Sequence, residues 1–184
     1  MTLRERMMVG DMRPTKLLPA TQTVKVEEPV APGPRDPRVL AGMAWKEKEP
    51  RKQRELIAEM LRGQSNVAVA LYLEMVVDAK RRSVALAALD DVKEPPVEAL
   101  IGELWNSRVA VRFAAARALG RIDGPGTTFE LVKLVEQNTK RREALAALMY
   151  SRGSDAADFM AGARQTAGLA MTVRAVEIQM KSVQ

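Results

Sequence analysis

The clearest hydrophobic pattern in this chain lies in residues 108–122. Apolar side chains recur there at steps of three and four residues, as on one buried face of a helix: Val109, Phe113, Ala116, Leu119 and Ile122. The intervening alanines are small enough to let a neighbouring helix approach closely. Gly120 and the later run Gly124-Pro125-Gly126 are predicted to end this helix.

Similar patterns recur along the chain at a nearly constant spacing. A basic residue is followed seven positions later by leucine at Arg54, Arg82, Arg112 and Arg141, which are 28, 30 and 29 residues apart. A shorter apolar segment precedes each of these helices, and Gly, Pro and Asn residues separate successive units. A period near 30 with a constant helical phase predicts an all-α chain built from stacked helix pairs.

The segment 111–120 reads Val-Arg-Phe-Ala-Ala-Ala-Arg-Ala-Leu-Gly, which resembles the second helix of a HEAT or HEAT-like (PBS lyase-type) repeat. The resemblance extends over about residues 38–184. It implies an α-solenoid of four to five helix pairs, the last of them degenerate, as terminal repeats often are. HEAT repeats often place an Asp in the turn within a pair, and here only Asp78 fits that pattern.

Residues 1–37 differ from the rest of the chain. They contain six of the ten prolines and have no helical period, so we expect an extended N-terminal arm before a helical domain at 38–184. Within the arm, Val24 and Val26 alternate with polar residues, which is typical of a strand that adds to a partner's sheet. The alternative is a solvated tail.

Composition narrows the function classes. The 184 residues include no Cys and no His, which excludes disulfides, thiolate metal sites, a Cys nucleophile and every Ser-His-Asp arrangement. Carboxylates show no convergent pattern, so we expect no metal and no cofactor. No apolar run approaches the ~18–20 residues that span a bilayer, and we expect a cytoplasmic protein without a membrane partner.

Basic residues cluster at the turn between the two helices of each pair. Because equivalent positions of stacked repeats lie side by side, these clusters predict one positive ridge: Arg51, Lys52 and Arg54; Lys80, Arg81 and Arg82; Arg108 and Arg112; Lys140, Arg141 and Arg142. Cations at a helix N-terminus oppose the helix dipole, so the recurrence is unexpected for a purely structural feature. The alternative is a solvated edge with a ladder of arginines within the fold.

Aromatic residues make up only 4% of the chain, so base-stacking groups are scarce. We interpret Trp105, Tyr72, Phe113 and Phe129 as core residues because they share the apolar phase of their helices.

These patterns favour a non-enzymatic scaffold or adaptor that docks a protein partner and is tethered into a larger assembly by its arm. A nucleic-acid-binding protein that uses the basic ridge is the alternative, since a net charge of +6 permits an anionic partner. A HEAT-like enzyme with a cryptic pocket is the third hypothesis. The oligomeric state is not indicated.

Overall fold

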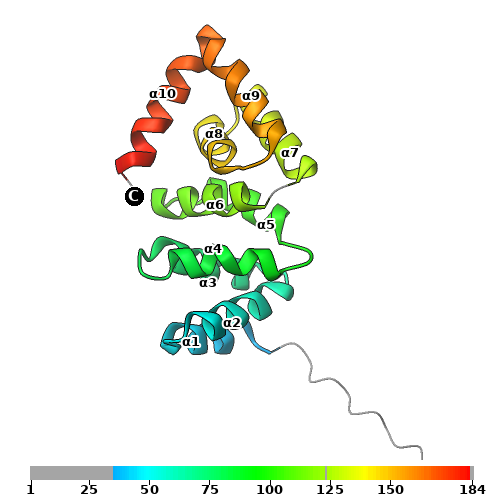
Figure 1. Ribbon diagram of the computed structural model, residues 1–184, viewed down its shortest axis with the longest axis vertical. Helices are drawn as coiled ribbons and strands as arrows, with labels where there is room; N and C mark the ends of the chain where they lie inside the picture. The colour runs from blue at the N-terminus through cyan, green and yellow to red at the C-terminus, as the bar shows by residue number, and fades with distance from the viewer. Residues whose placement is uncertain (1–34, 123, 183–184) are drawn as a thin grey trace, which may run out of the picture. The chain divides into compact units, whose positions relative to one another are not determined.

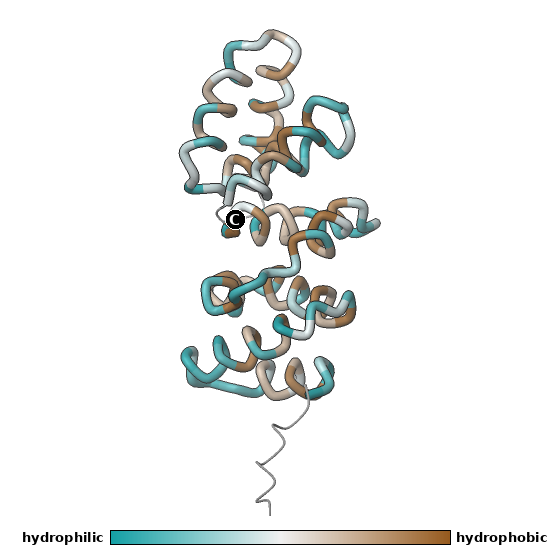
Figure 2. Tube along the Cα trace, turned by 90° about the vertical axis from the view of Figure 1, so that its right-hand side faces the viewer, coloured by the Kyte–Doolittle hydropathy of each residue, from teal (hydrophilic) through white to brown (hydrophobic). Residues whose placement is uncertain are grey.

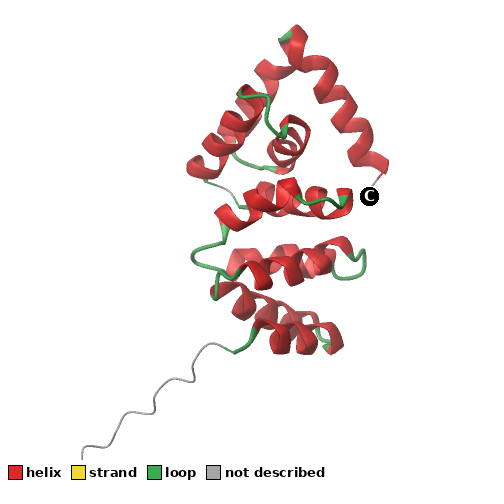
Figure 3. Cartoon of the chain, turned by 180° about the vertical axis from the view of Figure 1, so that it is seen from behind, coloured by secondary structure: helices red, strands yellow, loops and turns green. Residues whose placement is uncertain are grey.

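The computed structural model describes residues 35–122 and 124–182. The chain divides into Met1–Pro32 and Gly33–Gln184, and the described residues belong to the second unit. They form α-helices and short 3-10 turns with no strand among them (Figure 3). The prediction of an all-α chain is therefore confirmed for these residues. Most of the predicted arm, with the proposed strand at Val24 and Val26, lies outside them.

The described residues contain ten α-helices and two 3-10 helices. In chain order they are α1 (Pro37–Lys46), α2 (Pro50–Arg62), α3 (Asn66–Val77), α4 (Arg82–Ala88), η1 (Leu89–Asp91), α5 (Val97–Gly102), η2 (Glu103–Trp105), α6 (Val109–Arg121), α7 (Pro125–Glu136), α8 (Arg141–Tyr150), α9 (Ser154–Gln165) and α10 (Ala167–Ser182).

Local sequence explains several helix starts. The Asp36 carboxylate accepts a hydrogen bond of 2.8 Å from the Arg38 N–H, and Pro37 occupies the first turn of α1. The Ser65 hydroxyl oxygen accepts from the Ala68 N–H at 3.1 Å and caps α3. Both side chains satisfy N–H groups that the first helical turn leaves without an intrahelical partner.

Consecutive helices pack two by two: α1 with α2, α3 with α4, α5 with α6, α7 with α8, and α9 with α10. Each pair then packs on the next, through the contacts α2–α4, α4–α6, α6–α8 and α8–α10 among the second helices. In Figure 1 the pairs α1–α2 and α3–α4 and then helix α6 lie in successive layers. Each helix carries both hydrophobic and hydrophilic positions (Figure 2), so each can bury one side and expose another.

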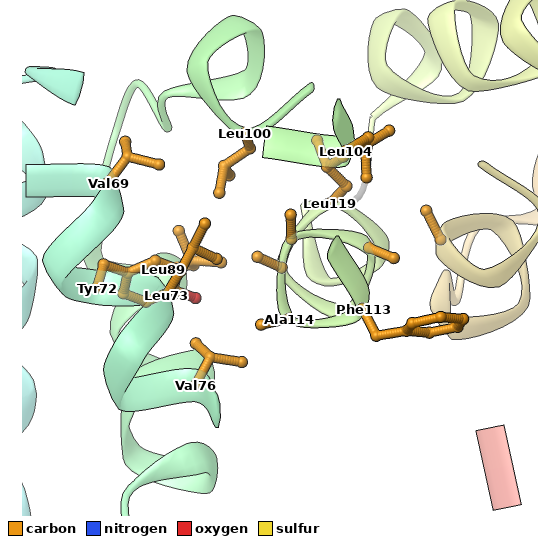
Figure 4. Close-up of a cluster of buried hydrophobic side chains, with 14 of the residues drawn as sticks. Val69, Tyr72, Leu73, Val76, Leu89, Leu100, Leu104, Phe113, Ala114 and Leu119 are labelled. Carbon is orange, nitrogen blue, oxygen red and sulfur yellow. The ribbon is translucent and has the colours of Figure 1, made fainter. Parts of the chain in front are cut away.

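The core between the layers is built from aliphatic side chains. Figure 4 shows Tyr72, Leu73 and Val76 of α3 on one side, with Ala114 and Leu119 of α6 opposite them. Ala114 is 3% exposed, and the other four residues are fully buried. Burial of this aliphatic surface, at about 25 cal/mol per Å², supplies the main force that holds successive pairs together.

Three predicted core residues lie at the surface instead. Val109 is 46% exposed, Trp105 47% and Phe129 66%. Val109 is the first residue of α6 and Trp105 the last of η2, so both lie at helix ends where the neighbouring pair no longer covers them. Tyr72 and Phe113 are buried, as predicted.

The helix predicted at 108–122 ends close to its predicted stop signals. Helix α6 passes Gly120 by one residue, ends at Arg121 and so stops before the run Gly124-Pro125-Gly126.

Candidate functional site

The basic residues at the turns explain how the two helices of a pair are joined. Arg82 Nε donates to the Val76 carbonyl oxygen at 3.1 Å, and Arg141 Nε donates to the Val135 oxygen at 3.1 Å. These carbonyls lie at the C-terminal end of the first helix of each pair, where the helix dipole is negative. The cations thus stabilise the end of one helix rather than opposing the start of the next.

The pairs α5–α6 and α1–α2 use variations of this contact. Arg112 Nη1 donates to the Asn106 and Ser107 oxygens at 3.0 and 3.1 Å, just beyond η2. In the first pair the buried Gln53 takes this role, since its Nε2 donates to the Ala44 oxygen at 2.8 Å. The counterpart of Arg82 in the first pair is therefore Gln53 and not Arg54.

Two further contacts of ridge arginines reach the neighbouring helix pair, and Arg81 also pairs within its own turn. Arg81 Nη1 contacts the Asp78 carboxylate at 2.8 Å, Arg81 Nη2 donates to the Trp45 oxygen at 3.0 Å, and its guanidinium lies 4.2 Å from the Trp45 ring centre. Arg112 Nε contacts the Glu143 carboxylate at 2.8 Å, and that side chain is only 11% exposed. The contacts of Arg81 with Trp45 and of Arg112 with Glu143 connect residues 36 and 31 positions apart, about one helix pair.

The remaining ridge residues divide into paired and solvent-facing groups. Arg54 pairs with Asp91, Arg108 with Glu74, Arg51 with Glu55 and Lys52 with Glu49, while Lys140 Nζ lies 5.9 Å from the Trp105 ring centre. Within the described part of the chain, the side chains of Lys80 and Arg142 make no hydrogen bond or ion pair, and both residues are exposed. Lys80 and Arg142 are therefore the ridge residues whose side chains make no ion pair, hydrogen bond or ring contact among the described residues, while Arg51, Lys52 and Arg108 form exposed surface pairs.

A second basic surface, which shares Arg51, Arg54 and Arg82 with the predicted ridge, lies on the second helices of the pairs. We term it the second-helix face. It carries three hollows in chain order. The α2 hollow, of about 600 Å³, is lined by Arg51, Arg54, Glu55, Ala58, Glu59, Arg62 and Asp91. The central hollow, of about 310 Å³, is lined by Arg82, Leu86, Arg117, Arg121, Tyr150 and Arg152. The α10 hollow, of about 250 Å³, is lined by Met149, Arg164, Glu177, Met180 and Lys181.

Residues that are consecutive in the chain lie at successive hollows. Asp91 in the α2 hollow accepts from Arg54 Nη2 at 2.7 Å, and its neighbour Asp90 accepts from Arg121 Nε of the central hollow at 2.9 Å. Tyr150, which lines the central hollow, and Met149, which lines the α10 hollow, are consecutive residues of α8. We refer to the three hollows together, from the α2 hollow to the α10 hollow, as the track.

Four guanidinium groups surround the central hollow. Arg117, 8% exposed, donates from Nε to the Tyr150 hydroxyl oxygen at 2.9 Å, and its guanidinium lies 5.3 Å from the Tyr150 ring centre. Burial, and next the nearby charge of Arg117, lower the pKa of Arg82 from its ordinary value. The hydrogen bond from Arg121 is the main cause that lowers the pKa of Asp90, with further help from the charges of Arg54 and Arg152.

Sequence reasoning found only Arg82 among these four arginines. The available signal was Arg117, a charged residue inside the alanine-rich helix at 108–122, where its neighbours Ala116 and Ala118 are fully buried. A charge at such a position requires partners, and the partner Tyr150 comes from the next helix pair. Helix pairing alone does not specify where these side chains converge.

No group of three or more His, Cys, Asp and Glu side chains in residues 35–122 and 124–182 has a geometry that could hold a metal ion. Over the same residues, no helix has the length and apolar character needed to cross a membrane.

Comparison with known proteins assigns no family to the chain. No protein-family model, no curated protein and no solved structure matches it. The functional argument therefore rests on the geometry of its own residues.

Proposed function

We propose that this chain is a HEAT-like α-solenoid that acts as a non-enzymatic scaffold and docks a protein partner on its second-helix face. The solenoid of four to five pairs follows from the repeat period near 30 residues. Support comes from the packing of each pair on the next and from polar contacts that connect residues about one pair apart. Arg54 with Asp91 and Arg112 with Glu143 are two of these contacts.

The observation that carries the docking proposal is the track of three hollows across α2, α4, α6, α8 and α10. Stacked helix pairs expose an extended surface, and such surfaces in repeat proteins bind elongated partners. The lining combines charged groups with the apolar side chains of Leu86, Met149 and Met180. Arg and Met, which recur in this lining, are among the residues enriched in protein interfaces.

The predicted ridge at the turns supports this choice over nucleic acid. Arg82, Arg112 and Arg141 are used to hold helix ends, and most other ridge residues have carboxylate or aromatic partners. Lys80 and Arg142 remain as the groups that a phosphate backbone would contact. Nucleic-acid binding at the ridge is therefore the alternative, and the arm at residues 1–37 would tie either complex into a larger assembly.

Two matched double variants separate these alternatives. Arg62 and Arg152 are exposed residues of the hollows, and Arg62→Glu with Arg152→Glu should abolish capture of the protein partner by the full chain. The control, Lys80→Glu with Arg142→Glu, makes the same change in charge at the ridge and should leave capture unchanged. Both variants should keep the helical circular dichroism of the parent.

The comparison is quantified by affinity capture and mass spectrometry from the source cells. A partner retained by the hollow variant but lost from the ridge variant would refute docking on the second-helix face. Loss of nucleic acid from the ridge variant, with a steep dependence of binding on salt, would support the alternative.

A further inference from the structure

The central hollow gathers arginines from three helix pairs around one small space. Arg82 begins α4, Arg117 and Arg121 lie four residues apart on α6, and Arg152 follows the end of α8. Among the described residues, Asp90 is the carboxylate that forms an ion pair with one of these arginines, Arg121. Like charges at close range repel one another, so an arrangement of this kind gains most from a ligand with negative charge.

The arginines keep donor groups for such a ligand. Arg82 uses Nε and Nη2 for the Val76 and Val77 oxygens, and Arg121 uses Nε and Nη2 for Asp90, so the Nη1 groups of both make no hydrogen bond in the described part of the chain. The Arg152 side chain makes neither a hydrogen bond nor an ion pair there. Each guanidinium carries five N–H donors in a planar fork that matches phosphate oxygens.

We propose that the central hollow binds a phosphate monoester carried by the protein partner, such as a phosphorylated side chain. This inference rests on the proposed function, because it places the phosphate on the segment that docks along the second-helix face. A phosphate monoester carries about 1.5 to 2 negative charges at pH 7 and offers three strong acceptor oxygens. Charge-assisted, bidentate hydrogen bonds from several arginines are the contacts that recognise this group.

The flanking hollows favour a single phosphate over a polyanion. Glu55, Glu59 and Asp91 line the α2 hollow and Glu177 lines the α10 hollow. A nucleic acid that followed the track would bring its phosphates against these carboxylates on both sides. Tyr150 holds Arg117 and so is occupied within the fold, which leaves the central hollow without a free platform for base stacking.

Inorganic phosphate is the first probe, titrated into the full chain at constant ionic strength and followed by the Nε–Hε NMR signals of the arginines. The signals of Arg82, Arg121 and Arg152 should shift with one common dissociation constant. Arg152→Gln removes a donor that makes no hydrogen bond or ion pair in the described part of the chain, and should weaken binding about tenfold. The control Arg142→Gln removes the same charge at the ridge and should change the constant less than twofold.

The second probe is an array of serine-containing peptides of varied flanking sequence, each present in phosphorylated and unmodified form. The full chain should bind phosphorylated members preferentially, and Arg152→Gln should remove that preference. A single-stranded oligonucleotide serves as the competing polyanion. It should bind more weakly than the best phosphopeptide and should leave the Arg152 signal in place.

Each contrary result has one meaning. The inference is overturned if phosphate shifts no arginine of the hollow, if Arg142→Gln weakens binding as much as Arg152→Gln, or if the oligonucleotide binds better than every phosphopeptide. Phosphate binding without any preference for phosphopeptides would place the ligand in solution and refute the link to the partner. Loss of partner capture by the Arg62→Glu, Arg152→Glu variant would preserve the proposed function in all of these cases.

Discussion

Replacement of Gly120 by alanine tests the close contact between α6 and α8, which depends on the absence of a side chain at this position. Gly120 lies in α6 against α8, and a Cβ atom added there would lie 2.5 Å from the Ala147 carbonyl oxygen and 2.5 Å from the Tyr150 Cβ. It would also lie 2.9 Å from the Tyr150 carbonyl carbon. These atoms belong to the backbone or are fixed directly to it, so no side-chain rotation can make room.

Two opposing effects set the magnitude. Alanine is favoured over glycine in a helix interior by about 1 kcal/mol, which would stabilise the variant. Forcing an extra methyl group into a packed interface costs about 1–3 kcal/mol, and more where the backbone itself must move. Because α8 must shift as a unit away from α6, we expect the upper part of this range, or a net loss of about 2 kcal/mol in the free energy of unfolding.

The assay is urea and thermal denaturation followed by circular dichroism at the helical band. A loss of about 2 kcal/mol should lower the melting temperature by roughly 4–8 °C in a chain of this size. Gly42→Ala in α1 and Gly162→Ala in α9 are matched controls, because no atom lies within 4 Å of an added Cβ at either position. Both should raise stability by up to about 1 kcal/mol.

The opposite signs make the test decisive. The reasoning fails if Gly120→Ala melts at or above the temperature of the parent chain, since α6 and α8 would then have space between them. It also fails if the controls lose stability as much as the Gly120 variant does, because a general intolerance of alanine would explain the result.

Three further changes test the polar contacts. Arg112→Ala should lower the free energy of unfolding by about 3 kcal/mol, because it leaves the buried Glu143 carboxylate without its cation. The double variant Arg112→Met, Glu143→Leu should recover most of that loss. Equal losses for the two variants in urea denaturation would contradict this reasoning. Tyr72→Phe should raise the free energy of unfolding by about 1 kcal/mol, since the buried Tyr72 hydroxyl has no hydrogen-bond partner among the described residues. A lower free energy of unfolding in the same assay would show that the hydroxyl does make a stabilising hydrogen bond. The pKa of Asp90 is lower in the folded chain than in the unfolded chain. Its stabilising contribution to the free energy of unfolding is therefore complete above the pKa of the unfolded state and is lost as the pH falls through the pKa of the folded state. Between pH 6 and pH 2 the melting temperature should therefore fall more steeply for the parent chain than for Asp90→Asn. Parallel plots of melting temperature against pH would contradict the assignment.

Helix content followed from the sequence because helical periodicity is a local property. The apolar steps at 108–122 predicted α6, and the repeated spacing predicted the other second helices. The predictions that failed depended on neighbours. Phe129 was assigned to the buried face of α7, yet it is 66% exposed, because the buried positions of this helix are Thr127, Leu131 and Val135 and Phe129 lies on the opposite side. Gly120 was interpreted as a stop signal, whereas its missing side chain serves the close contact with α8.

The basic turns show the same division. The sequence located Arg82, Arg112 and Arg141 at equivalent points of successive pairs but not the direction of their side chains. The structure turns them back onto the carbonyl ends of the first helices. The orientation depends on the antiparallel partner helix, whose C-terminal end lies beside the turn and supplies the negative end of a dipole.

The sequence by itself determined that this chain forms helices in pairs with a period near 30 residues, because spacing of apolar residues specifies which side of each helix must be buried. Only the tertiary structure decided which charges stay within the fold and which remain for a ligand. Arg82, Arg117, Arg121 and Arg152 meet at the central hollow from three helix pairs. Their convergence depends on the distance and angle at which successive pairs pack, which no local pattern in the chain records.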